Sequence, residues 1–192
     1  MSTPVLELVA GPNGAGKTTF VDRILEPRTH LPFVNAHRIG TERWLGEEEE
    51  HAYAASDAAD LARRELMATR TSFIAETVFS HPSKRDLAVA ATAQGYLVHL
   101  HVLMCPVEVS IARVAQRVIE GGHSVPEQKI RERHDRLWTL VAEARATVEW
   151  TTIYDTTSVP SFRRVARYRR GTLIESRGWP AWTPTPLLPT AA

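Results

Sequence analysis

The segment Gly11-Pro12-Asn13-Gly14-Ala15-Gly16-Lys17-Thr18 matches the pattern G-x-x-x-x-G-K-[ST] at every fixed position. Glycines let a backbone wrap closely around phosphates and point its N–H groups inward. Lys17 is then expected to reach the β- and γ-phosphates, and the Thr18 hydroxyl to bind Mg²⁺ as the metal ligand. We therefore predict that residues 11–18, here called the phosphate loop, together with Thr19, bind ATP and Mg²⁺.

Two arginines later in the chain are candidates for the same phosphates. Arg113 and Arg117 lie four residues apart on an expected helix and therefore share one face. A guanidinium fork suits phosphate oxygens, although a pair of solvated arginines is the alternative. Arg131 and Arg133, which follow a break at residues 121–126, are weaker candidates.

Acidic and imidazole side chains supply further candidates. Glu76 ends an expected strand, where a carboxylate facing a cleft can hold substrate hydroxyls or order a water on Mg²⁺; capping the next helix is the alternative. Asp155 also ends a strand, near where adenine would lie, and turn formation explains it equally well. His99 and His101 point the same way from one strand. We expect them to be buried and hydrogen-bonded, without a metal, because no suitably spaced cysteine or carboxylate accompanies them.

These side chains need a framework of alternating strands and helices. The pattern predicts strands over residues 5–10, 33–36, 72–77, 96–104 and 152–155, and helices over 16–25, 47–68, 83–94, 106–120 and 127–150. Such alternation indicates an α/β fold of the P-loop NTPase type, with a parallel five-stranded sheet flanked by helices. The arginine-rich residues 163–170 favour a solvated helix over an anion-binding patch. We expect one domain over residues 1–177 and a Pro-rich tail over 178–192.

Composition narrows the functional classes. The chain has 192 residues and a formal net charge of +1, so no global field indicates nucleic acid or a membrane as a partner. The single cysteine, Cys105, lies in an apolar run and is expected to be a buried thiol in a reducing compartment. The first apolar run is too short for a signal peptide, and no run could span a bilayer, so we expect a cytoplasmic protein.

The loop sequence also resembles that of ABC-type ATPases, but neither their signature segment nor their Asp-Glu strand end occurs here. A guanine-reading NKxD-like motif is also absent, which disfavours a GTPase. Five segments in order instead resemble the zeta toxin family of P-loop kinases, and together they extend over about residues 5–157. They are residues 10–20, 33–36, 72–77, 95–98, and 113–118 followed by 121–126.

This resemblance implies an adenylate-kinase-like core with a short lid, and an ATP-dependent kinase acting on a hydroxyl of a sugar nucleotide such as UDP-N-acetylglucosamine. It assigns the arginines of the lid helix, Arg113 and Arg117, to the ATP phosphates, and Glu76 with Thr77 to the sugar substrate. His123 in the lid is a further candidate for contact with substrate, with a surface position as the alternative. An antitoxin protein is a possible partner of such a kinase.

His37 departs from the family pattern. Similar sequences read Asn-Ala-Asp after the second strand, and that aspartate takes the proton of the acceptor hydroxyl; this chain reads Asn-Ala-His. Histidine can accept a proton near neutral pH, so His37 is our candidate catalytic base. Two alternatives remain open: a kinase with another small-molecule acceptor, and a nucleotide-binding switch that transfers no phosphate.

Overall fold

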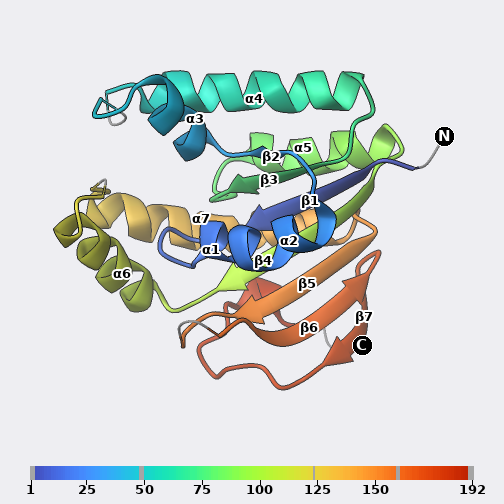
Figure 1. The fold of residues 1–192 in the computed structure, drawn as a ribbon. Helices are drawn as coiled ribbons and strands as arrows, with labels where there is room; N and C mark the ends of the chain where they lie inside the picture. The colour runs from blue at the N-terminus through green and yellow to red at the C-terminus, as the bar shows by residue number, and fades with distance from the viewer. Residues whose placement is uncertain (1–2, 48–49, 123, 159–160, 190–192) are drawn as a thin grey trace.

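A single mixed sheet organises the chain (Figure 1). The computed structural model describes residues 3–47, 50–122, 124–158 and 161–189. Within these residues the sheet has seven strands in the spatial order β2-β3-β1-β4-β5-β6-β7. The strands are β1 (Val5–Ala10), β2 (Phe33–Val34), β3 (Phe73–Thr77), β4 (Leu97–Met104), β5 (Trp150–Asp155), β6 (Arg163–Arg169) and β7 (Thr172–Ser176).

The first five strands are parallel, which confirms the expected parallel core, but the prediction of five strands in total was wrong. The prediction of a helix over residues 163–170 was also wrong, because β6 and β7 form an antiparallel hairpin on the edge of β5. Arg170 and Gly171 both have positive φ and join the two strands, as a two-residue hairpin turn requires. A bulge in β6 disturbs the alternation of its side chains, which obscured the strand pattern in the sequence.

Helices connect the strands and cover both faces of the parallel core (Figure 1). They are α1 (Lys17–Phe20), η1 (Val21–Leu25), α2 (Glu26–Thr29), α3 (Ala36–Arg43), α4 (Ala52–Ala68), α5 (Pro82–Ala93), α6 (Val107–Ile119), α7 (Glu127–Arg145) and the short η2 (Thr185–Leu187). The helix expected over 47–68 begins only at Ala52, and α3 was not anticipated. Asn35 starts α3, because its side-chain oxygen accepts hydrogen bonds from the first backbone N–H groups.

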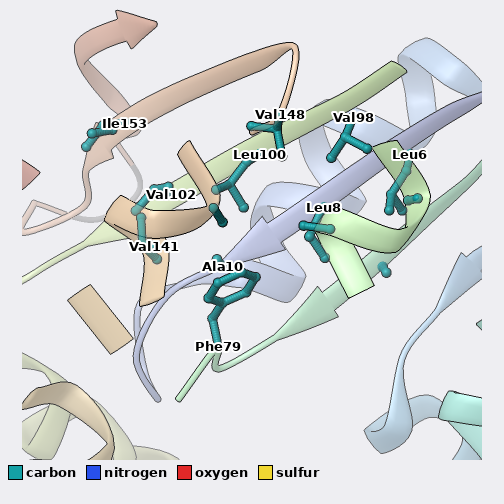
Figure 2. Packing of buried hydrophobic residues seen from close by; sticks show 14 of the residues in the cluster. Leu6, Leu8, Ala10, Phe79, Val98, Leu100, Val102, Val141, Val148 and Ile153 are labelled. Atoms are coloured by element: carbon teal, nitrogen blue, oxygen red, sulfur yellow. The ribbon is translucent and has the colours of Figure 1, made fainter. Parts of the chain in front are cut away.

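Alternation of side chains along β1 divides the core into two layers. Leu6, Leu8 and Ala10 pack on the side of α4, α5 and α7, where the larger hydrophobic cluster lies (Figure 2). Val9 faces the opposite side and packs with Phe20 and other residues of α1 and η1. The helix that follows the phosphate loop is therefore held against the sheet by its own hydrophobic layer.

The remaining expectations concern Cys105 and the end of the chain. Cys105 is fully buried, as expected, and burial raises the pKa of its thiol. Part of the Pro-rich segment lies across α7 and β6, where Leu187 is buried and its carbonyl accepts a hydrogen bond from Arg145. No helix among the described residues is long and apolar enough to cross a membrane.

Candidate functional site

The phosphate loop leaves β1 and enters α1 at the carboxyl edge of the parallel strands. Gly14 and Gly16 have φ of 73° and 83°, a backbone conformation that favours glycine. Gly11 is required for a different reason: a Cβ there would lie 2.5 Å from the carbonyl oxygen of Leu103 in β4. The glycines therefore bring the loop close to the sheet and turn it sharply into the helix.

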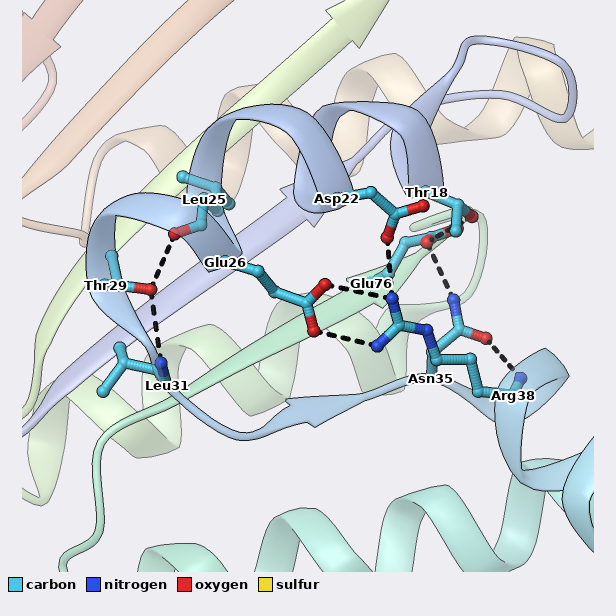
Figure 3. A network of polar contacts seen from close by, with 9 residues as sticks. All are labelled: Thr18, Asp22, Leu25, Glu26, Thr29, Leu31, Asn35, Arg38 and Glu76. Carbon is cyan, nitrogen blue, oxygen red and sulfur yellow. Dashed lines mark hydrogen bonds and ion pairs between the residues drawn. The ribbon is translucent and has the colours of Figure 1, made fainter.

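Glu76, at the end of β3, contacts three polar side chains of the site, and Figure 3 shows two of them, Thr18 and Asn35. Its Oε2 accepts a hydrogen bond from Thr18 Oγ1 at 2.9 Å and another from Asn35 Nδ2 at 2.8 Å. Its Oε1 lies 3.9 Å from the ammonium nitrogen of Lys17. One carboxylate thus connects the phosphate loop with the N-terminus of α3, and it does not cap the following helix, which begins at Pro82 with His81 as its cap.

Lys17 is buried although it carries a charge. Its Nζ donates a hydrogen bond to the carbonyl oxygen of Pro12 at 3.0 Å. Burial lowers the pKa of Lys17, and the nearby Glu76 carboxylate opposes this effect. An anion placed beside Lys17 would favour its charged form in the same way, so the environment of this side chain suits a phosphate.

Arg38 fixes the position of α3 relative to η1 and α2, the helical segments that follow the phosphate loop and α1 (Figure 3). Its guanidinium donates to both carboxylate oxygens of Glu26, at 2.8 and 3.0 Å, and to Asp22 at 2.7 Å. The hydrogen bond from Arg38 lowers the pKa of Glu26, as expected for a close ion pair. His37, the preceding residue, is thereby held at the start of α3 on the rim of the site.

A cleft of about 790 Å³ brings most of the predicted residues together. The predicted residues on its wall are Asn13, Gly14, Gly16, Lys17, Thr18, Thr19, His37, Glu76, Thr77, Arg113 and Arg117. The other loop residues, Gly11, Pro12 and Ala15, are buried and do not line the cleft. His123 lies outside the described residues.

The two arginines of α6, Arg113 and Arg117, both line the cleft. Arg113 donates hydrogen bonds to the carbonyl oxygens of Gly14, Thr156 and Thr157, at 3.2, 2.8 and 3.0 Å. It therefore ties the phosphate loop to the loop after β5. Of the two weaker candidates, Arg133 lines the cleft, whereas Arg131 is exposed and paired with Glu108 and Glu127.

Asp155 is placed at the end of β5, outside the lining of the cleft. Its Oδ1 accepts hydrogen bonds from the backbone N–H and the hydroxyl of Thr157, at 2.9 and 2.6 Å. This geometry agrees with turn formation. Asp155 also forms an ion pair with Arg163 of β6.

Sequence reasoning missed a basic part of the cleft formed by two helices. Arg63 of α4 and Lys84 of α5 both line the cleft, and both form ion pairs with Asp60. Arg63 is buried, and its Nε has no hydrogen-bond partner among the described residues. The spacing of Ala55, Ala59 and Arg63 was the available signal, because it places an arginine on the apolar face of α4.

Comparison with solved structures finds the same fold at low sequence identity. A chain of the AvrRxo1-ORF1:-ORF2 complex gives a TM-score of 0.70 at 17% identity, covering 90% of this chain and 60% of that one. A chain of this complex with ATP gives 0.62 at 17% identity, with the same coverage. A chain of the PezAT toxin-antitoxin system of Streptococcus pneumoniae gives 0.64 at 16% identity, covering 87% of this chain and 72% of that one. The present chain thus spans 60% of the AvrRxo1 chains that it matches.

A search among curated proteins found no match. The sequence profile of the zeta toxin family matches residues 46–165, which is more than half of the chain. This region begins after the phosphate loop, so the loop is assigned independently by its pattern and geometry. It includes Glu76, Arg113 and Arg117. The chain belongs to the zeta toxin family.

Proposed function

We propose that this protein is an ATP-dependent kinase that transfers the γ-phosphate to a hydroxyl of an anionic small molecule, a sugar nucleotide. The observation that carries the proposal is the position of Glu76. Its carboxylate contacts Thr18 of the phosphate loop and Asn35 at the start of α3, within one cleft. A nucleotide bound by the loop and an acceptor lying against α3 would therefore meet beside Glu76.

The phosphate side of the cleft has the groups that phosphoryl transfer needs. The loop would hold the phosphates through its backbone N–H groups, and Lys17 would contact their oxygens. Two oxygen atoms, Thr18 Oγ1 and Glu76 Oε2, lie 2.9 Å apart, and oxygen ligands are those that Mg²⁺ prefers. Thr18 and Glu76 would hold a Mg²⁺ ion there, directly or through water, and the ion would neutralise part of the phosphate charge.

Arg113 and Arg117 extend the positive charge along the cleft. In our proposal Arg117 contacts ATP phosphates, while Arg113 acts on the shape of the loop. The hydrogen bonds of Arg113 to Gly14 and Thr156 support its role in shaping the loop, because they occupy its guanidinium with backbone carbonyls. Arg133, on the wall of the same cleft, is a further candidate for phosphate contact.

The acceptor side of the cleft supports an anionic substrate. Arg63 and Lys84 share one carboxylate partner, Asp60, so this part of the wall carries a net positive charge. The buried Nε–H of Arg63, which has no hydrogen-bond partner among the described residues, would donate a hydrogen bond to a diphosphate oxygen. His37 lies on the same wall, where it would accept the proton of the acceptor hydroxyl, with Thr77 contacting the sugar.

The proposal is tested by incubating the purified protein with γ-labelled ATP, Mg²⁺ and a panel of UDP-sugars, and by analysing the products by mass spectrometry. We expect UDP-N-acetylglucosamine or a related sugar nucleotide to gain one phosphoryl group. Lys17→Met should abolish the product, and His37→Gln should lower kcat about a hundredfold or more. His51→Gln, a change outside the cleft, is the matched control.

Two other outcomes would contradict the proposal in different ways. Transfer to an uncharged metabolite, with no labelled sugar nucleotide, would refute the acceptor class. ATP binding without transfer to any acceptor would favour a nucleotide-binding switch, and His37→Asp would then be expected to gain activity because it restores the residue usual in similar sequences.

An antitoxin partner is a separate part of the proposal. The toxin-antitoxin assignment of the PezAT system supports it, together with membership of the zeta toxin family. Co-purification of this chain with the product of a neighbouring gene, and loss of phosphoryl transfer in that complex, would support such a partner. Unchanged transfer in a stable complex would refute inhibition by that protein.

A further inference from the structure

Three potential metal ligands meet on the sheet outside the cleft described above. Glu7 lies on β1, and His99 and His101 lie on the neighbouring β4. In the parallel register Glu7 is paired with His99, so all three side chains project from the same face. We expected no metal here because no cysteine or carboxylate has a suitable spacing along the chain; Glu7 comes close to the two histidines only across the strand pair.

The ligand atoms of this cluster converge on one carboxylate oxygen. Glu7 Oε2 lies 2.6 Å from His101 Nε2 and 3.4 Å from His99 Nδ1. The centres of the two imidazole rings are 3.9 Å apart. Donors bound tetrahedrally at Zn–N and Zn–O distances of about 2.0 Å are separated by roughly 3.3 Å. The contact of Glu7 with His99 already has this separation, and the contact with His101 would need to open by less than 1 Å.

The surroundings of His99 suit a ligand. Its Nε2 lies 2.9 Å from Thr152 Oγ1, and when Nε2–H donates to that oxygen, the lone pair of Nδ1 points towards Glu7. Metal-bound histidines commonly fix the opposite ring nitrogen in this way. The positive charge of Arg167 lies near His99 and would weaken cation binding.

The cluster is sheltered but remains accessible to an ion. The His101 side chain is buried and packs against Phe20 of α1, with ring centres 5.3 Å apart. The side chains of His99 and Glu7 keep 25% and 14% of their surface exposed, which leaves an approach from solvent. Two imidazoles with one carboxylate favour Zn²⁺ and related transition-metal ions over Mg²⁺ or Ca²⁺.

We propose that Glu7, His99 and His101 form a binding site for a divalent transition-metal ion of the Zn²⁺ type, with a fourth position left for water. The ion would join β1 to β4 next to Phe20. Phe20 follows Thr18 of the phosphate loop by two residues, so the site would lie close to the loop. Its role is to stabilise the strand pair that carries the loop. This site is independent of the proposed kinase activity.

Metal uptake by the purified full chain, after treatment with a chelator, tests the site. Titration with Zn²⁺ should show one site that is lost in Glu7→Gln and in His99→Gln. Thr152→Val, which removes the hydrogen-bond partner of His99 Nε2, should weaken binding about 10- to 100-fold. Two controls should bind Zn²⁺ as the unaltered protein does. His51→Gln removes a histidine outside the cluster, and Glu76→Gln removes a carboxylate at the phosphate loop, which is the competing site for the ion.

The unaltered protein alone also decides the question, even where a variant fails to fold. X-ray absorption of the Zn²⁺-loaded protein should show two imidazole nitrogens and one carboxylate oxygen at about 2.0 Å. A hundredfold excess of Zn²⁺ over its Kd should raise the Tm by about 5–10 °C. Absence of Zn²⁺ uptake, equal uptake by His99→Gln, or an anomalous diffraction peak elsewhere would overturn the proposal. The cluster would then be a set of hydrogen-bonded side chains without a metal.

Discussion

Replacing Glu76 with glutamine tests the arrangement of the whole site. The change keeps the shape of the side chain and removes the charge that Thr18, Asn35 and Lys17 surround. Two hydrogen bonds to a charged acceptor become bonds to a neutral one, and each loses about 1 kcal/mol. The ammonium of Lys17, 3.9 Å away, loses its counter-charge as well.

We therefore expect Glu76→Gln to lower the free energy of unfolding by about 2 kcal/mol, and the Tm by about 4–8 °C in a chain of this length. Because the same carboxylate orders Thr18 and the start of α3, kcat for phosphoryl transfer should fall about a hundredfold or more. Urea unfolding and transfer of labelled phosphate measure the two effects on the same preparation.

Glu65→Gln is the matched control, because Glu65 is an exposed glutamate on α4. It should change stability by less than about 0.5 kcal/mol and leave transfer unaltered. If Glu76→Gln were as stable and as active as this control, Glu76 would not organise the site, and the reasoning from its contacts would be refuted.

Three further changes test single contacts. Gly11→Ala places a Cβ 2.5 Å from the carbonyl oxygen of Leu103 and should lower stability by about 1–3 kcal/mol, measured by thermal unfolding; an unchanged Tm would contradict this. Arg113→Met removes three hydrogen bonds to loop carbonyls and should raise the KM for ATP about tenfold. The control Arg131→Met removes an exposed ion pair and should leave the KM for ATP unchanged. Burial opposes ionisation of Asp155, but hydrogen bonds from neighbouring hydroxyl, N–H and guanidinium groups outweigh it and lower its pKa. The stability from this carboxylate is present above its usual pKa of 3.8 and is lost as the pH falls through the lowered pKa. Asp155→Asn should therefore lose less stability than the unaltered protein between about pH 5 and pH 2. Urea unfolding at each pH measures this difference.

Local patterns in the sequence predicted the parallel core and the phosphate loop well. A loop of fixed spacing between an apolar strand and a helix depends on neighbouring residues, so Lys17 and Thr18 could be placed without a structure. Glu76 could be placed at the carboxyl edge for a similar reason, because parallel strands end on one side of a sheet. Its contacts with Thr18 and Asn35 required the structure, since these residues come from three separate elements.

Pairing between distant segments explains what the sequence did not reveal. The strand β6 is arginine-rich and contains a bulge, so its pattern resembles that of a polar helix until the edge of β5 is available to pair with it. The proximity of Glu7 to His101 depends on the register of β1 and β4, which no spacing along the chain expresses. Arg63 is buried because α4 packs with its small residues towards the core, leaving the guanidinium at the cleft.

A crystal structure with a non-hydrolysable ATP analogue, Mg²⁺ and UDP-N-acetylglucosamine tests the central proposal most directly. We predict the γ-phosphate beside Lys17 and Glu76, the diphosphate of the acceptor near Arg63 and Lys84, and an acceptor hydroxyl within hydrogen-bond reach of His37. A nucleotide bound away from the phosphate loop, or an acceptor hydroxyl that faces away from the γ-phosphate and His37, would contradict the proposal.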